Sequence, residues 1–273
     1  MANKTWKGDD SGNEGNYGTA ANWEPSGVPG AGDNVRLTAD FTQDITATLD
    51  QSAVAIGDFI VEEGYTGAIG TVAADLQIDP NRFEFAGTGT SFIDLGTAAI
   101  SCQVNRTKAG GTGTRGLYLK GSAIATLTVK SGSVGLASRH GDTATITTAV
   151  LAGASADVWI GEGVTITNLY VNGGACKIRS AATAVHVYGG TILTEEEGAI
   201  NTINQFAGTA TLNSTGTVTT INHGGGVVDL SQSGAARTIT TYSPEKGAAL
   251  IDNPIVVITN YNRTAAAARI SFT

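Results

Sequence analysis

The chain contains few of the residues that build reactive or metal-binding sites. Its 273 residues include two cysteines and three histidines. Cys102 and Cys176 are too far apart in the sequence for a metal-binding spacing. We interpret Cys176 as a buried free thiol with a structural role. None of His140, His186 and His223 has a second histidine at ligand spacing. The sequence therefore argues against zinc.

Long apolar runs are also missing. No segment is long and apolar enough to cross a bilayer, and the opening Met1–Trp6 has no apolar core of a secretory signal. We therefore expect the protein to fold in a cytoplasm. The net charge is -8, from 16 basic and 24 acidic side chains. An acidic balance argues against a nucleic-acid or membrane partner, because both present negatively charged phosphates.

Glycine, threonine and small aliphatic residues dominate what is present. The chain holds 37 glycines, only 6% aromatic residues and no long run with a helical apolar period. An aliphatic residue, in most cases flanked by threonine and followed by glycine, recurs at intervals of about nineteen residues, a period typical of solenoids. These aliphatic anchors are Leu127, Ile146, Ile166, Val185, Ile200, Val218, Ile239 and Val257.

A second row of aliphatic residues supports the period. It stands about twelve positions after most anchors, as expected if each repeat contributes two strands to one stack. Its members are Val158, Ile178, Leu212, Leu230 and Ile251.

The two rows predict an all-β fold of the parallel β-helix, or β-solenoid, type. Side chains alternate along a strand, so the anchors point into a core while their neighbours, such as Thr167 and His186, point outward. Glycines between the rows, such as Gly174 and Gly208, supply the backbone freedom needed at corners. Crossovers between parallel strands are predominantly right-handed, which predicts a right-handed solenoid.

The first 37 residues differ from the repeats and are expected to form an N-terminal cap. They hold Trp6 and Trp23 in a setting rich in Gly, Asn and Pro, including Pro25 and Pro29. Large indole rings suit the covering of an open solenoid end. The expected segments are the cap at 1–37, the solenoid at 38–258 with irregular coils at 38–119 and regular coils at 120–258, and a C-terminal cap or exchanged strand at 259–273.

The opening also carries a resemblance. Thr5-Trp6, a Gly/Asn loop, Asn22-Trp23, Gly27-Val28-Pro29 and Gly32-Asp33-Asn34-Val35 resemble the start of many β-solenoid proteins of bacteriophage particles and of bacterial surface passengers. Passengers ordinarily carry an export signal ahead of this motif, which favours the phage group. The resemblance implies a non-enzymatic decoration, spike, fibre or tail protein located in the virion.

The implied partners are other capsid or tail proteins and further copies of the chain, a trimer by analogy with fibres. A host-surface glycan is a further partner consistent with such a role. A fragment of a bacterial surface adhesin is an alternative, which the absence of an export signal opposes.

Carboxylates are the remaining candidates for metal binding or catalysis. Asp9, Asp10 and Asn13 lie in a segment that is either a calcium site or an ordinary Asx-rich turn, and the glycine and acid positions fit a calcium loop poorly. No cofactor is otherwise expected. Asp157 and Asp229 have the same offset from their anchors but belong to different coils, too far apart for two-carboxylate glycoside chemistry.

The other alternative function is a polysaccharide-binding or polysaccharide-degrading β-helix. Its site would then lie in the irregular half of the chain, where Asp75, Asp79 and Arg82 are the candidates. The triple Glu195-Glu196-Glu197 is interpreted as a solvated turn.

Overall fold

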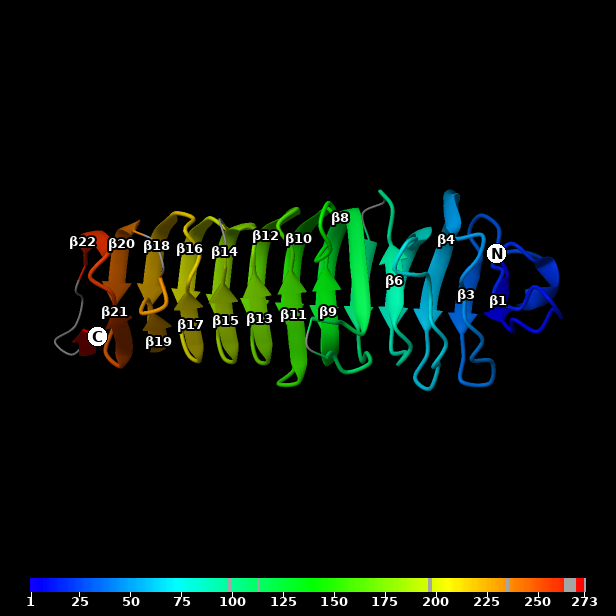
Figure 1. The fold of residues 1–273 in the computed structure, drawn as a ribbon, viewed down its shortest axis with the longest axis horizontal. Coiled ribbons are helices and arrows are strands. Elements are labelled where there is room, and N and C mark those ends of the chain that lie inside the picture. Colours follow the sequence, from blue (N-terminus) through cyan, green and yellow to red (C-terminus); the bar gives the residue numbers. More distant parts are fainter. Residues whose placement is uncertain (98–99, 112, 196–197, 234–235, 263–268, 273) are drawn as a thin grey trace.

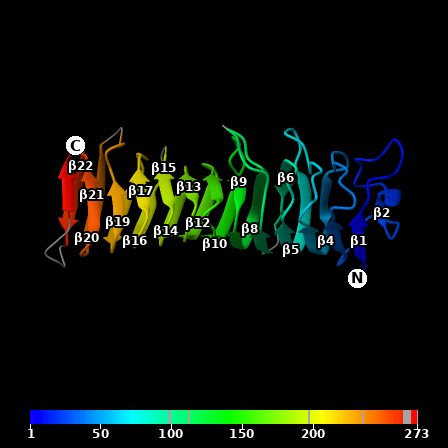
Figure 2. The ribbon, with the colours of Figure 1, turned by 90° about the horizontal axis from the view of Figure 1, so that it is seen from below.

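The chain folds as a rod of stacked parallel strands. A computed structural model describes residues 1–97, 100–111, 113–195, 198–233, 236–262 and the backbone of 269–272. It is all-β, 1% helical, with parallel strands stacked as a β-solenoid of about 11 turns. Figures 1 and 2 show an elongated molecule whose strands run across its long axis, with the two termini at opposite ends. The predicted all-β parallel solenoid is confirmed.

The N-terminal half holds long strands and an entry segment. Its elements are β1 (Asn3–Trp6), the 3₁₀ turn η1 (Ala20–Asn22), β2 (Trp23–Glu24), β3 (Asn34–Leu37), β4 (Asp50–Val61), β5 (Leu76–Phe85), β6 (Ser91–Asp94), β7 (Ile100–Val104), β8 (Leu117–Val129) and β9 (Gly132–Leu136).

The C-terminal half is more regular. Its elements are β10 (Ala144–Leu151), β11 (Ala156–Ile160), β12 (Val164–Val171), β13 (Ala175–Ile178), β14 (Ala181–Val187), β15 (Thr191–Thr194), β16 (Ile200–Gln205), β17 (Thr209–Leu212), β18 (Val218–His223), β19 (Gly226–Asp229), β20 (Arg237–Pro244), β21 (Ala248–Asp252), β22 (Val256–Tyr261) and β23 (Arg269–Phe272).

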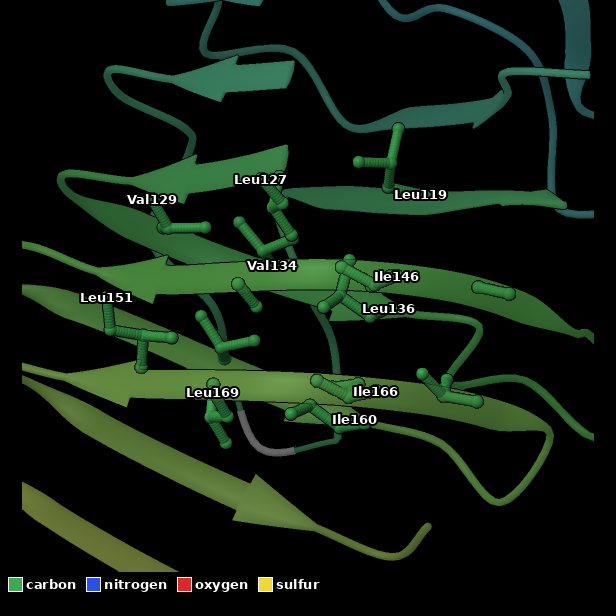
Figure 3. Close-up of a cluster of buried hydrophobic side chains, with 14 of the residues drawn as sticks. Leu119, Leu127, Val129, Val134, Leu136, Ile146, Leu151, Ile160, Ile166 and Leu169 are labelled. Carbon is green, nitrogen blue, oxygen red and sulfur yellow. The ribbon is translucent and has the colours of Figure 1, made fainter. Parts of the chain in front are cut away.

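Each regular coil contributes one bent strand and one short strand. In β12 the buried positions alternate up to Ile166, then Thr167 and Asn168 both face outward, and alternation resumes at Leu169. The strand bends where two successive residues face outward, so β12 provides two inward-facing runs and β13 provides a third. Figure 3 shows Ile166 and Leu169, one from each run of β12, among the buried side chains of the neighbouring strands.

The core uses the residues that the sequence singled out, apart from two. Leu127, Ile146, Ile166, Val185, Ile200, Val218, Ile239, Val158, Ile178, Leu212 and Leu230 are all buried.

Their register is finer than predicted, because the anchors belong to two inward rows. Ile146 pairs with Ile166, and Ile200 pairs with Val218. Leu127 instead pairs with Ala149, in the row to which Val185 also belongs. The two rows lie three residues apart, on opposite sides of the bend in each strand.

The second predicted row also divides in two. Val158 pairs with Cys176, whereas Ile178 pairs with Ile160. Both pairs are inward, because positions two apart in a strand share a face. Cys102 and Cys176 are free and buried, and burial raises the pKa of both thiols, which agrees with the expected inert thiol at Cys176.

Val257 and Ile251 contradict their predicted core positions. Val257 is 58% exposed and pairs with the outward Thr238, while Val256 is buried and Ile258 is partly buried. Ile251 is half-buried, and the buried residues of β21 are Ala248 and its neighbour Leu250. A one-residue difference in register turns a side chain to the opposite face of a strand, which explains both errors.

The entry segment buries its aromatic residues together. The Trp6 and Trp23 rings pack edge to face with centroids 5.1 Å apart, and Tyr17 lies 4.7 Å from Trp23. Strand β1 pairs with β3 in parallel and with β2 antiparallel, so the parallel stack begins within the segment expected to be a cap. Pro29 is buried, whereas Pro25 is exposed and its carbonyl accepts a hydrogen bond from Lys4 Nζ at 2.9 Å.

The last strand belongs to the same chain's stack. The predicted strand Arg269–Phe272 is present as β23 and pairs in parallel with β21. Residues 263–268 and 273, which complete the expected C-terminal segment, lie outside the described residues.

Glycines with positive φ form one corner of successive coils. Gly190 and Gly208 have φ of 71° and 73°, a conformation that favours glycine. A Cβ at Gly208 would lie 2.3 Å from the carbonyl oxygen of Gly190, so the corner is also too tight for any side chain. Gly174 and Gly226 repeat this conformation in the neighbouring coils, and the predicted glycine corners are confirmed.

Candidate functional site

Two adjoining grooves flank the loop of residues 138–143, between β9 and β10. One groove of about 400 Å³ is lined by Arg139, His140, Asp142, Glu162 and Arg179 among others. The second, of about 350 Å³, is lined by Ser52, Gln77, Asp94, Lys120 and Asp142 among others. Residues 141–143 line both grooves, so together they form one polar depression along the rod.

The buried carboxylate of Asp75 contacts one cation from the lining of each groove. Asp75 precedes β5, and its side chain is 5% exposed. Both of its oxygens accept hydrogen bonds from Arg139 Nη2 at 2.6 Å, and Lys120 Nζ lies 2.8 Å from Oδ2. The carboxylate is therefore compensated by two cations, as a buried charge requires.

Two further carboxylates complete an ion cluster that we define as Asp75, Asp94, Lys120, Arg139 and Asp142. Lys120 Nζ lies 3.6 Å from Asp94 and 3.4 Å from Asp142. Arg139 Nε donates to Asp142 Oδ2 at 2.8 Å. Three carboxylates thus converge on the Lys120 ammonium, and the loop of residues 138–143 is fixed to β5, β6 and β8.

Aromatic rings extend the support of Arg139. Phe92 and Tyr118 stack with centroids 4.8 Å apart and planes 6° from parallel. The Arg139 guanidinium carbon lies 5.3 Å from the Phe92 centroid and 5.9 Å from that of Tyr118. Stacking on aromatic rings suits a planar guanidinium and limits its motion.

Lys120 and Arg139 are held in their charged forms, which suits the binding of a ligand better than proton transfer. Burial opposes the protonation of Lys120, but the hydrogen bond to Asp75 and the neighbouring carboxylates outweigh it and raise the pKa of Lys120. The pKa of Arg139 is raised in the same way. A general base needs a pKa near the working pH, so neither cation is arranged to accept a proton. The cluster is arranged to hold charge in fixed positions.

Only one of the three residues expected in the polysaccharide alternative belongs to the cluster. Asp75 is its centre, whereas Arg82 pairs with Asp58 at 3.0 Å and Glu84 at 2.6 Å on the surface of β4 and β5. Asp79 lies within β5, opposite Ala55 of β4.

Sequence reasoning missed the residues that meet Asp75. Arg139 is 64 positions from Asp75 in the chain, so no local spacing links them. Asp94 and Lys120 are cross-strand partners, and correct alignment of the irregular coils would have paired them.

A second charged group lies on the face formed by β11, β13 and β15. Asp157 pairs with Arg115, whose guanidinium carbon lies 3.4 Å from the Trp159 ring centroid. Glu195 pairs with Lys177 at 2.8 Å and with Arg179 at 3.3 Å. Glu195 directly follows the end of β15, and its side chain is 22% exposed. Glu196 and Glu197, the rest of the predicted solvated turn, lie outside the described residues.

Asp157 and Asp229 do not share a row either. Asp157 pairs with Ala175, whereas Asp229 pairs with Thr211, which pairs with Leu193. The carboxylates are offset along the strands as well as separated by intervening coils.

The three histidines lie apart. His140 is exposed in the groove loop. His186 stacks on Tyr170 with centroids 4.6 Å apart, and burial lowers its pKa. His223 is fully buried and is level with Gln205, on a different row from His186, as predicted.

The acidic N-terminal segment is held by its own hydrogen bonds. Asn13 Nδ2 donates to Asp10 Oδ2 at 3.1 Å, and Asp9 pairs with Lys7 at 3.2 Å. Asn22 accepts from the Asp10 backbone and donates to the Asn13 carbonyl. Across the described part of the chain, no group of three or more His, Cys, Asp or Glu side chains is placed to hold a metal ion. Calcium at Asp9, Asp10 and Asn13 stays a sequence-based prediction.

The fold places this chain among parallel β-solenoid proteins, a class defined by architecture. Beyond that class, no protein-family model, no curated protein and no solved structure matches the chain. None of the helical segments in the described residues has the length and apolar character of a membrane span.

Proposed function

We propose that this chain is a non-enzymatic structural component of a bacteriophage particle: a head decoration, spike, fibre or tail protein that acts as a rigid β-helical module. The observation that carries the proposal is the continuous stack of strands from β1 to β23 around one apolar core. A stack of this kind resists bending because every interior coil is hydrogen-bonded to two neighbours.

The N-terminal motif supports the phage assignment. Trp6 and Trp23, which carry the resemblance to virion β-solenoids, are buried at the start of the rod and fix its entry geometry. The proposed partners are other virion proteins and further copies of the chain, with a homotrimer as the proposed assembly.

Analysis of purified particles tests this proposal. Mass spectrometry should detect the chain in virions at a fixed ratio to the major capsid protein, and analytical ultracentrifugation of the isolated protein should show a trimer. Absence of the chain from washed particles would overturn the assignment, whereas a monomer in solution would remove only the trimer.

The paired grooves favour a second candidate, the binding of a polysaccharide along the rod. They join across residues 141–143 and present carboxylates, cations and hydroxyl groups to a linear polar ligand. Thr143 is exposed and lines both grooves, so Thr143→Trp should fill them while leaving every residue of the ion cluster unsubstituted.

A glycan array of bacterial surface polysaccharides tests the second candidate. Binding that is lost in Thr143→Trp but retained in Thr147→Trp, an exposed position outside the grooves, would support it. Release of oligosaccharides from capsule-like or pectin-like polymers would show degradation and contradict the non-enzymatic assignment.

A further inference from the structure

Arg237, the first residue of β20, is buried although it carries a charge. It is 5% exposed and lies on the same inward face of β20 as the core residue Ile239, two positions along the strand. Its Nη2 atom donates to the carbonyl oxygen of Leu212 at 3.1 Å and to that of Ser214 in the preceding coil. The guanidinium is therefore fixed in position by backbone groups.

The rest of this guanidinium has no hydrogen-bond partner among the described residues. Nε and Nη1 of Arg237 are buried without a hydrogen bond in the described part of the chain, as is the hydroxyl of the adjacent Ser214. No carboxylate within the described ranges forms an ion pair with Arg237. Burial correspondingly lowers the pKa of this arginine.

An uncompensated buried cation is unfavourable, because desolvation is offset only by a counter-charge or by hydrogen bonds. Among the described residues Arg115 is also buried, and its charge is compensated by Asp157, although its Nε has no hydrogen bond either. Arg237 has two donor nitrogens, with three N–H groups between them, and an uncompensated positive charge, so an acceptor with negative charge would complete it.

Arg237 also lines a pocket that opens to solvent. The pocket has a volume of about 290 Å³, and Thr215, Thr217 and Thr238 contribute to its lining. Ile255 and Val257, exposed by 41% and 58%, form its apolar side. Threonine hydroxyls and a guanidinium can donate hydrogen bonds to an oxyanion. The two aliphatic side chains can pack against the apolar part of a small organic ligand that carries it.

We propose that this pocket binds a small ligand bearing an oxyanion, a carboxylate in the first instance, against Arg237. The net charge of the protein is -8, which disfavours indiscriminate anion binding and makes a saturable site here informative. The site lies near the C-terminal end of the rod, on coils remote in sequence from the grooves at residues 138–143, and does not depend on the proposed structural role.

Equilibrium dialysis with radiolabelled sulfate tests the site, with acetate and glucuronate as competitors. We expect one sulfate per chain, displaced by both carboxylates. Stronger displacement by glucuronate than by acetate would identify an acidic sugar as the source of the oxyanion, and equal displacement would identify a simple carboxylate. Arg237→Met should weaken sulfate binding at least tenfold. Arg36→Met removes the same charge from an exposed ion pair with Glu62 and should leave binding unchanged.

A conservative variant separates loss of binding from loss of folding. Arg237→Lys keeps the charge but lacks the guanidinium fork, so it should remain folded by circular dichroism and bind sulfate about tenfold more weakly. The proposal is overturned if the wild-type protein binds none of the three anions saturably, or if Arg237→Met and Arg237→Lys bind sulfate as the wild type does.

Discussion

Ile166 and Thr167 are neighbours in β12 that face opposite sides of the same strand. Ile166 is buried between Ile146 and Ala182 of the adjacent coils, while Thr167 is exposed. At the residue scale, this alternation decides which substitutions the rod tolerates.

Ile166→Asp should abolish cooperative folding, because it places an unpaired carboxylate in the core. The milder Ile166→Ala should lower the free energy of unfolding by about 2–5 kcal/mol. Thr167→Asp, one position away, should change it by less than about 0.5 kcal/mol. Urea unfolding followed by circular dichroism measures all three; a well-folded Ile166→Asp variant would contradict the core assignment.

His223 makes stability depend on pH. Its Nε2 lies 3.2 Å from the carbonyl oxygen of Gly226, which can only accept, so Nδ1 accepts from the Tyr242 hydroxyl at 2.7 Å. The ring is thus neutral in the folded protein, and burial lowers its pKa below that of the unfolded chain. The folded state is fully favoured above about pH 6.5 and loses stability as pH falls below it.

His223→Gln should reduce the loss of stability between pH 6.5 and pH 5. One buried histidine contributes a slope of at most about 1.4 kcal/mol per pH unit to the free energy of unfolding. Gln205, buried at the same position of the preceding coil, shows that glutamine fits this row. Urea unfolding at several pH values compares the two proteins, and parallel pH profiles would show that His223 does not carry the effect.

At the scale of elements, glycine corners set the path between strands. Gly208 and Gly247 both have positive φ, 73° and 94°, but their surroundings differ. A Cβ at Gly208 would meet the Gly190 carbonyl, whereas a Cβ at Gly247 would have no described atom within 4 Å apart from its chain neighbours.

The pair separates backbone strain from steric overlap. Gly247→Ala should cost about 1–2 kcal/mol from φ alone. Gly208→Ala adds a clash with the Gly190 carbonyl of the preceding coil, which the Thr209 N–H holds in place, so we expect a loss above about 3 kcal/mol. Thermal and urea unfolding of both variants provide the measurement, and equal losses would mean that the corner can open.

The period of the strands was readable from the sequence because small aliphatic residues and glycines recur where the core and corners need them. The division of the anchors between two inward rows could not be predicted from the sequence. Leu127 and Ile146 look equivalent in sequence, but the bend in each strand places them on different rows. Val257 was placed inward because both of its neighbours are also aliphatic, which leaves the register ambiguous.

The ion cluster could not be predicted from residue spacing, for a different reason. Asp75, Lys120 and Arg139 come from different coils and meet only when the irregular half of the chain is folded. Charged residues also carry no periodic signal there. Spacing therefore predicted the scaffold, while the charged contacts depend on loops whose lengths vary between coils.

At the scale of the whole molecule, the regular coils are interchangeable units. Ile200 pairs with Val218, and Val185 pairs with Ile203, eighteen positions apart in each case. Each coil supplies its neighbours with the same edge, so stability is approximately a sum over coils.

Inserting a second copy of residues 200–217 after residue 217 should preserve folding and lengthen the rod by one strand spacing, about 4.8 Å. Three inserted copies should add about 14 Å, which small-angle scattering can detect. Doubling only residues 200–208 should disrupt folding, because it places a corner against a strand. Equal tolerance of both insertions would contradict the coil as the unit.

The direction of the hydrogen bonds gives the rod an unequal response to force. The strands lie across the long axis of the rod (Figure 1). The backbone hydrogen bonds that join neighbouring coils therefore run along that axis. Pressure along the axis compresses closely packed coils, whereas a pull applied to the two chain ends detaches the terminal coils one at a time. The molecule is thus suited to bearing thrust rather than tension.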